Sequence, residues 1–157
     1  MVALRFVSGL ALALWLGGAV AIGSVVAPSA FAVLNAGDAA SLVGETLRRF
    51  HVVTYVAGSI LLAGLAGMAL VGPRPRGFAW RMLIAALMLA ATLASGLWVD
   101  QRIRAMREEI GAPVSTLARD DARRVTFGQL HGLSTLLMGF TVLGGVALVY
   151  WDTRDAR

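Results

Sequence analysis

The order of apolar and charged positions divides this chain into four long apolar runs that are separated by short charged segments. No run contains Asp, Glu or Arg, and each is long enough to supply the roughly 20 apolar residues that a helix needs to cross a bilayer. The runs are Phe6–Gly37, Phe50–Pro73, Met82–Val99 and Val125–Trp151. They predict an all-α integral membrane protein in which four helices form an up-down bundle.

Helix start and stop signals refine these runs into four spans of a single domain, residues 1–157. We expect the spans at about residues 3–26, 49–71, 78–99 and 126–151. The first should lose its regular helix near Pro28, which lacks a backbone N–H. Asp38 should cap a short amphipathic segment that leads into the second span. The first run is longer than the about 7–15 apolar residues of a signal peptide, so we interpret it as a retained span.

Charge returns after the third span, and residues 100–126 are predicted to form a helical hairpin outside the bilayer. Ile103, Met106 and Ile110 continue an apolar stripe at helical spacing beyond the span. The glycine and proline at positions 111 and 113 should end that helix.

The returning arm of the hairpin carries its own helix signals. Ser115 or Thr116 is expected to cap it, and Asp120 is expected to support it by pairing with Arg124, four residues later.

Small residues recur every fourth position along the first span, at Gly9, Ala13, Gly17 and Ala21. Such a stripe allows another helix backbone to approach closely. We expect it to pack inside the bundle, with a dimer face as the alternative. Possible partners are therefore the lipid bilayer and either a second copy through this stripe or a protein docked on the 100–126 hairpin.

Composition supports the membrane assignment and excludes several chemistries. Hydrophobic residues make up 58% of the chain, and the mean hydropathy is +0.76. The absence of cysteine excludes disulfides and thiolate chemistry. The net charge of +5 comes from arginines that lie beside the predicted spans, where lipid headgroups explain them better than nucleic acid does.

The arginine pattern favours a cell (inner) membrane protein with both termini in the cytoplasm. Arg5 precedes the first span and no arginine follows it closely. Trp80, Tyr150 and Trp151 should mark the interface on the side of the termini, because aromatic side chains collect at membrane surfaces.

The only two histidines, His51 and His131, open the second and fourth spans at matched depth. In both spans the third and fourth residues after the histidine carry hydroxyl groups, so each histidine heads a short polar stripe. These hydroxyl residues are Thr54 and Tyr55 in one span and Ser134 and Thr135 in the other. Asp100 ends the third span on the same side, so His51, His131 and Asp100 are candidates for one cluster.

Several roles remain open for this cluster. Two imidazoles and a carboxylate suit a divalent metal such as zinc or copper, and two histidines could ligate haem iron. The histidines could also relay protons or contact a partner. The ordinary alternative is that each imidazole bonds across helices or to headgroups. No catalytic residue is predicted, and the absence of charge within the runs argues against a stand-alone secondary transporter.

Three segments resemble the TMEM205-like family of small membrane proteins, also called the DUF4149 family. They are Gly23–Leu34 with the following Leu42–His51, then Asp100–Arg107, and then Phe127–Ser134, which is the most specific match. The resemblance implies a four-helix membrane protein with His131 and Ser134 as pattern residues at the entrance of the last helix. It implies no settled enzyme activity.

The sequence therefore predicts a non-enzymatic membrane component that is structural, accessory or related to metal or drug tolerance. The alternative is a metal- or haem-binding redox or transport component that uses the two histidines and Asp100. No cofactor is expected under the first hypothesis.

Overall fold

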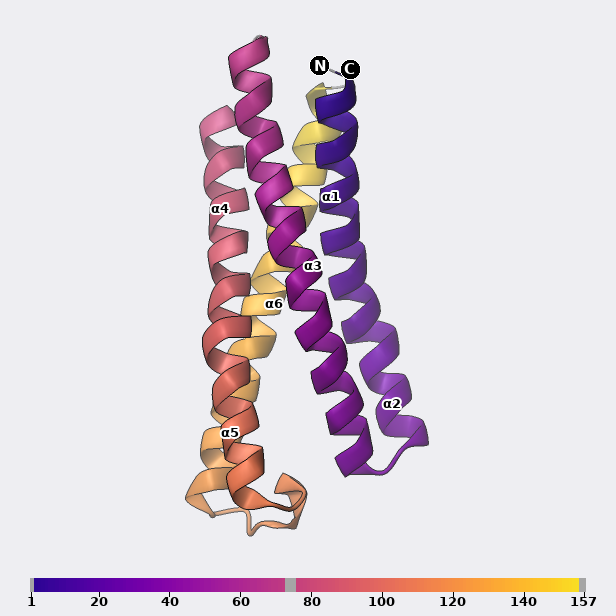
Figure 1. The fold of residues 1–157 in the computed structure, drawn as a ribbon, viewed down its shortest axis with the longest axis vertical. Coiled ribbons are helices and arrows are strands. Elements are labelled where there is room, and N and C mark those ends of the chain that lie inside the picture. The colour runs from indigo at the N-terminus through magenta and orange to yellow at the C-terminus, as the bar shows by residue number, and fades with distance from the viewer. Residues whose placement is uncertain (1, 73–75, 156–157) are drawn as a thin grey trace.

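The computed structural model describes residues 2–72 and 76–155 and shows four long helical columns arranged as an up-down bundle (Figure 1). The first column consists of α1 (Val2–Ala21), the π-helical turn η1 (Ile22–Val26) and α2 (Ala27–Val33). The second is α3 (Ala36–Val71). The third consists of α4 (Phe78–Ala94), the π-helical turn η2 (Ser95–Val99) and α5 (Asp100–Ile110). After the 3₁₀ turn η3 (Val114–Thr116), α6 (Ala122–Asp155) forms the fourth.

The columns form a closed ring in which neighbours run in opposite directions. α1 packs on α3, α3 on α4, α4 on α6, and α6 returns to α1. The two termini consequently share one end of the bundle, as predicted, and the α2–α3 and α5–α6 connections share the other, which we call the loop end (Figure 1). α3 and α6 lie diagonally across the ring, so the two helices that carry the histidines face each other through its interior.

The outer surface of the bundle is apolar on every side. Each column contains a window with mean hydropathy of 1.9–2.1, yet only 17–39% of each window is buried within the protein. Side chains such as Leu136 and Leu143 on α6 are more than 70% exposed. Because water offers no favourable contact for such a surface, the chain is a multi-pass membrane protein.

The helices are longer than the layer they cross. α3 has 36 residues and is therefore about 54 Å long at about 1.5 Å per residue, whereas the hydrocarbon core is about 30 Å thick. The polar ends of the columns extend beyond the apolar layer.

The interface between α1 and α3 differs from the one that the small-residue stripe predicted. Gly9, Ala13, Gly17 and Ala21 all face outward. Trp15 is instead the largest buried residue of α1, and it packs where Gly58 of α3 leaves space. The expected packing of the stripe inside the bundle is wrong, because burial of the large Trp15 turns the opposite face of α1 to the outside. An oligomer through this stripe stays a prediction.

The first column also continues past Pro28, near which its regular helix was expected to end. η1 lies directly before Pro28, and the Ala27 N–H donates to the carbonyl of Ile22, five residues back. Pro28 thus occupies the first turn of α2, where its missing N–H removes no helix bond. The regular α-helix is thus interrupted by η1 close to Pro28, as expected, but the helical column does not end there.

The amphipathic segment and the second span form one helix rather than two pieces. The cap is Asn35, whose side-chain oxygen accepts from the Asp38 N–H at 3.0 Å. Asp38 lies within the first turn and accepts from the Asn35 amide at 2.6 Å. The sequence therefore predicted a cap in the correct turn but assigned it to the wrong residue.

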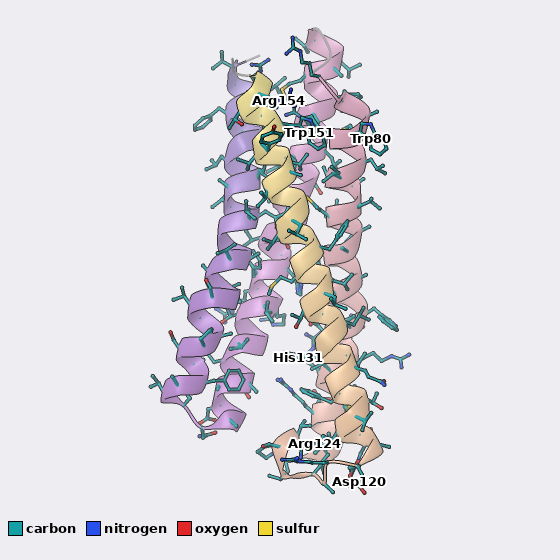
Figure 2. The ribbon with its side chains drawn as sticks, turned by 180° about the vertical axis from the view of Figure 1, so that it is seen from behind. Trp80, Asp120, Arg124, His131, Trp151 and Arg154 are labelled. Carbon is teal, nitrogen blue, oxygen red and sulfur yellow. The ribbon has the colours of Figure 1, made fainter. Side chains whose placement is uncertain are left out.

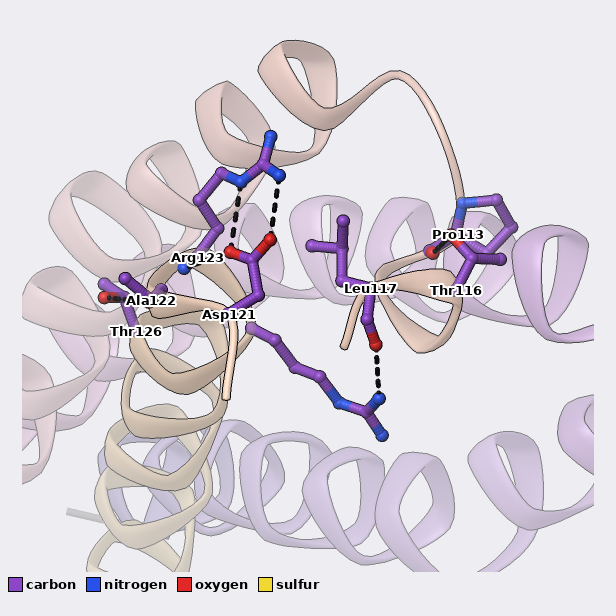
Figure 3. A network of polar contacts seen from close by, with 8 residues as sticks. Pro113, Thr116, Leu117, Asp121, Ala122, Arg123 and Thr126 are labelled. Atoms are coloured by element: carbon purple, nitrogen blue, oxygen red, sulfur yellow. Dashed lines mark hydrogen bonds and ion pairs between the residues drawn. The ribbon is translucent and has the colours of Figure 1, made fainter. Parts of the chain in front are cut away.

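The predicted hairpin has one helical arm and one irregular arm. α5 projects beyond the third span as expected and ends at Gly111, whose φ of +64° favours glycine. Thr116 does not cap a long helix. It lies in η3 and donates to the Pro113 carbonyl at 2.7 Å (Figure 3). The next long helix, α6, starts only after this irregular segment, at Ala122.

Asp121 caps α6, and its carboxylate accepts from the Arg123 N–H at 2.9 Å and from the Arg123 guanidinium (Figure 3). Hydrogen bonds from the Arg123 side chain lower the pKa of Asp121 to about 2. Arg124 donates to the Leu117 carbonyl at 2.7 Å instead of pairing with Asp120, which precedes the helix. The predicted Asp120–Arg124 pair is therefore wrong.

The opposite end is closed by an ion pair that the sequence did not predict. Arg81 of α4 is 3% exposed and pairs with Asp152 of α6. Trp80 and Trp151 lie at this end, as the predicted aromatic belt requires (Figure 2). The connection from α3 to α4 contains residues 73–75, which lie outside the described residues. The side of the membrane that the termini occupy stays a prediction.

A glycine pair tests the α1–α3 interface. A Cβ at Gly58 would lie 2.9 Å from both Leu89 and Trp15, whereas a Cβ at Gly17 meets nothing within 4 Å. We expect Gly58→Ala to destabilise the protein by about 1–3 kcal/mol through overpacking. Gly17→Ala should be neutral or stabilise the helix by up to about 1 kcal/mol. Thermal unfolding in detergent compares the two variants, and equal effects would contradict this packing.

Candidate functional site

A cavity of about 510 Å³ opens between the four columns at the loop end. Both predicted polar stripes reach it: His51 and Thr54 line it from α3, and His131, Ser134 and Thr135 line it from α6. α3 and α6 face each other across the ring, so the stripes approach the cavity from opposite sides. The structure therefore brings the two stripes to a common space, and Asp100 lines it as well.

The wall of the cavity changes from apolar to charged along the bundle axis. Trp15, Ala19 and Ala91 line its inner part and are almost fully buried. Arg104 and Arg107 line it near the loop end. Since the helices extend beyond the hydrocarbon layer at this end, the inner wall lies at the depth of the acyl chains and the charged rim at the depth of the headgroups.

His51 faces a carboxylate on the neighbouring column. Its Nδ1 lies 3.0 Å from Oδ2 of Asp100, and the two side chains are only 12% and 13% exposed. The distance suits an ion pair with a protonated imidazole, but no directed hydrogen bond to Nδ1 forms among the described residues. The Tyr55 ring stacks on the imidazole with 6.0 Å between centroids.

Gly96 makes this close approach possible. It lies in the π-helical turn η2, where an added Cβ would lie 2.0 Å from the Tyr55 hydroxyl oxygen and 3.0 Å from Nδ1 of His51. Its neighbour Ser95 lies 3.3 Å from Ser134 of α6, oxygen to oxygen. η2 therefore contacts both polar stripes, which is consistent with the frequent occurrence of π turns at functional sites.

His131 has a different environment from His51. It is exposed and stacks on Phe127 of its own helix, with 6.4 Å between ring centroids. In residues 2–72 and 76–155, no three His, Cys, Asp or Glu side chains gather so that they could hold a metal ion. The metal site of His51, His131 and Asp100 is not assembled in this structure, and it stays a prediction together with haem.

Two arginines on one face of α5 dominate the rim. Arg107 donates to the Ala40 carbonyl of α3 at 3.1 Å, and its guanidinium lies 5.4 Å from the centroid of the Phe127 ring of α6. It thereby links three columns across the end of the cavity. Arg104 lines the cavity without a hydrogen bond or an ion pair to any described residue.

Three other charged residues at the start of α3 pair with one another. Glu45 of α3 accepts from Arg48 and Arg49 at 2.6–2.7 Å. The sequence pointed to His51, His131, Asp100 and Ser134, whereas Arg104 and Arg107 stood out only as charges beside the third span. Their spacing of three residues places both on one helix face, and this spacing could have indicated from the sequence that they act together. Gly96 carried no signal, because only the contacts of its neighbours reveal its role.

A family model described as a domain of unknown function, DUF4149, matches residues 10–112. The chain belongs to the DUF4149 family. The match runs from α1 to just beyond α5 and includes His51, Asp100, Arg104 and Arg107. No curated protein and no solved structure matches the chain significantly.

The family assignment confirms the DUF4149 part of the sequence resemblance, whereas the TMEM205-like label stays a prediction. The segment that appeared most specific, Phe127–Ser134, lies outside the matched residues. The two histidines differ in burial, because the His51–Asp100 pair is largely buried whereas His131 is exposed.

The two histidines provide a direct test of this difference. We expect His51→Ala to lower the free energy of unfolding by about 1–3 kcal/mol, because Asp100 loses its polar neighbour in a largely buried position. His131→Ala should change it by no more than about 0.5 kcal/mol. Unfolding of both variants in the same detergent measures the difference, and a larger loss for His131→Ala would show that the environments are assigned wrongly.

The close approach of Tyr55 to Gly96 is tested by adding a Cβ at position 96 and by removing the Tyr55 hydroxyl group. Gly96→Ala should destabilise the protein by about 1–3 kcal/mol, since the new Cβ displaces Tyr55 and His51. Tyr55→Phe removes the hydroxyl oxygen that the Cβ would meet and should restore part of this loss in the double variant. A double-mutant cycle measures the coupling, and strictly additive effects would contradict the close approach.

Proposed function

We propose that this DUF4149 protein is a non-enzymatic accessory component of the cell (inner) membrane that binds an amphiphilic molecule in the cavity at the loop end. The single observation that carries this proposal is the change from an apolar inner wall to an arginine rim along one continuous cavity. A ligand with an apolar body and a charged head matches that gradient. A role in tolerance follows if the cavity sequesters membrane-active compounds.

The size of the cavity supports a small-molecule ligand. Its volume of about 510 Å³ lies within the range of about 300–1,000 Å³ that is usual for such sites. The lining is mainly apolar and has a few polar groups at one end, which suits orientation of the ligand rather than multiple specific bonds.

The charges of the rim favour an acidic head. The single carboxylate of Glu45 pairs with both Arg48 and Arg49, which leaves this cluster positively charged, and Asp100 faces His51. Arg107 is bound to a backbone carbonyl. Arg104 is the cation of the rim without a partner among the described residues, so a carboxylate or phosphate would complete its hydrogen bonding.

The polar contacts support binding rather than nucleophilic catalysis. Thr54 and Thr135 donate to the backbone carbonyls of His51 and His131, not to the rings. Among the described residues no hydroxyl group is bonded to either imidazole, so neither histidine is placed to activate a serine or threonine.

Binding of a fluorescent long-chain fatty acid to the purified protein tests the proposal. We expect Arg104→Gln to raise the Kd about tenfold, which corresponds to about 1.4 kcal/mol. Arg102→Gln is the matched control, because Arg102 lies on the same helix but packs over Trp98 away from the cavity. It should leave the Kd unchanged.

The corresponding long-chain alcohol should bind to wild type more weakly than the acid and be insensitive to Arg104→Gln. Absence of saturable binding to wild type, or equal weakening by both arginine variants, would refute the proposed function.

A further inference from the structure

The cavity has two sides that could admit a ligand, and polar contacts close only one of them. Between α3 and α5, the Arg107–Ala40 hydrogen bond and the His51–Asp100 pair bridge the gap. Between the η1–α2 segment and α6, no hydrogen bond or ion pair joins the columns within the described part of the chain. Figure 2 shows the α1–α2 column separating from α6 toward the loop end on this second side.

The residues that line the second side are almost all apolar. Ile22, Ala27 and Phe31 line the cavity from the η1–α2 segment, and Leu137 and Met138 line it from α6. Phe31 is 54% exposed, so the edge of this opening continues into the lipid-facing surface. We call the gap between Ile22–Phe31 and Leu137–Met138 the lateral portal.

Gly23 and Met138 lie close together across the portal. A Cβ at Gly23 would lie 3.3 Å from the terminal methyl carbon of Met138, and no other atom lies within 4 Å of it. One edge is therefore a residue without a side chain, and the other is a flexible, unbranched side chain that changes rotamer easily. Rotation of the Met138 side chain would remove its methyl group from Gly23 and widen the portal at this point.

We propose that the ligand enters this cavity sideways from the bilayer through the lateral portal, past Gly23 and Met138. The ligand class is then a single-chain amphiphile with an acidic head that is already dissolved in the membrane. This inference rests on the proposed function. An apolar chain that entered from water would have to cross the charged rim of Arg104 and Arg107, whereas through the portal it stays in apolar surroundings throughout.

The portal is tested by the rate of exchange in vesicles of phosphatidylcholine that hold the reconstituted full chain and a fluorescent long-chain fatty acid. Gly23→Trp should slow both binding and release about tenfold with little change in Kd, because a barrier affects both rates equally. Met138→Ala should accelerate both. Gly17→Trp is the matched control, since Gly17 faces open space on the same column, and it should exchange at the wild-type rate.

A second design closes the portal after the protein has folded. The chain contains no cysteine, so Met138→Cys introduces a unique thiol. Its reaction with a bulky maleimide in the purified protein should slow exchange, as Gly23→Trp does. Leu136→Cys is the control, because Leu136 lies on the same helix but is 73% exposed toward lipid. Its modification should leave the rates unchanged.

The outcomes separate this inference from the proposed function. If wild type binds the fatty acid in a manner that depends on Arg104, but neither Gly23→Trp nor modified Met138→Cys alters exchange, the portal is refuted and the binding function stands. If wild type does not bind the fatty acid, the proposed function fails and the portal fails with it. Slowing by both portal variants and by neither control supports lateral entry.

Discussion

The mismatch between long helices and a thinner apolar layer determines where this protein can carry polar groups. Columns of about 50 Å cross a layer of about 30 Å, so the excess length lies at the membrane surfaces. Within the layer, side chains must be apolar or bonded to the protein itself. The charged residues of α5 and of the start of α3 are tolerated because they lie beyond it, and this is the region into which the cavity opens.

Uneven packing along the axis explains why the cavity lies at only one end. The buried core consists largely of Trp15 and the residues around it toward the termini, including Leu65, Met88 and Leu148. The Arg81–Asp152 pair joins α4 to α6 at that end. Toward the loop end the columns separate, and η1 and η2 interrupt both descending columns within the wall of the cavity. The closed half of the bundle therefore supports an open half that is free to hold a ligand.

Lateral access would make the membrane both solvent and source for the ligand. The arginine rim would then hold the head at the depth where headgroups normally lie, while the inner wall replaces neighbouring lipid chains. Such a site needs little chemistry beyond shape and one unpaired cation. These modest requirements are consistent with a chain that has only two histidines, no cysteine and no assembled metal group among its described residues.

The order of residues predicted the number of helices, their alternation, the shared end of the termini and the polar stripes headed by His51 and His131, because apolar length and helical period are local properties. It could not determine which face of α1 is buried, because the face of Trp15 and the face of the Gly9-to-Ala21 stripe were both plausible. It also could not determine that η1 continues the helix past Pro28. Packing between the columns places His51, not His131, against Asp100, and Gly96 leaves the space for this contact. These outcomes depend on the relative rotation of neighbouring helices, which long-range packing sets and the order of residues along one helix does not.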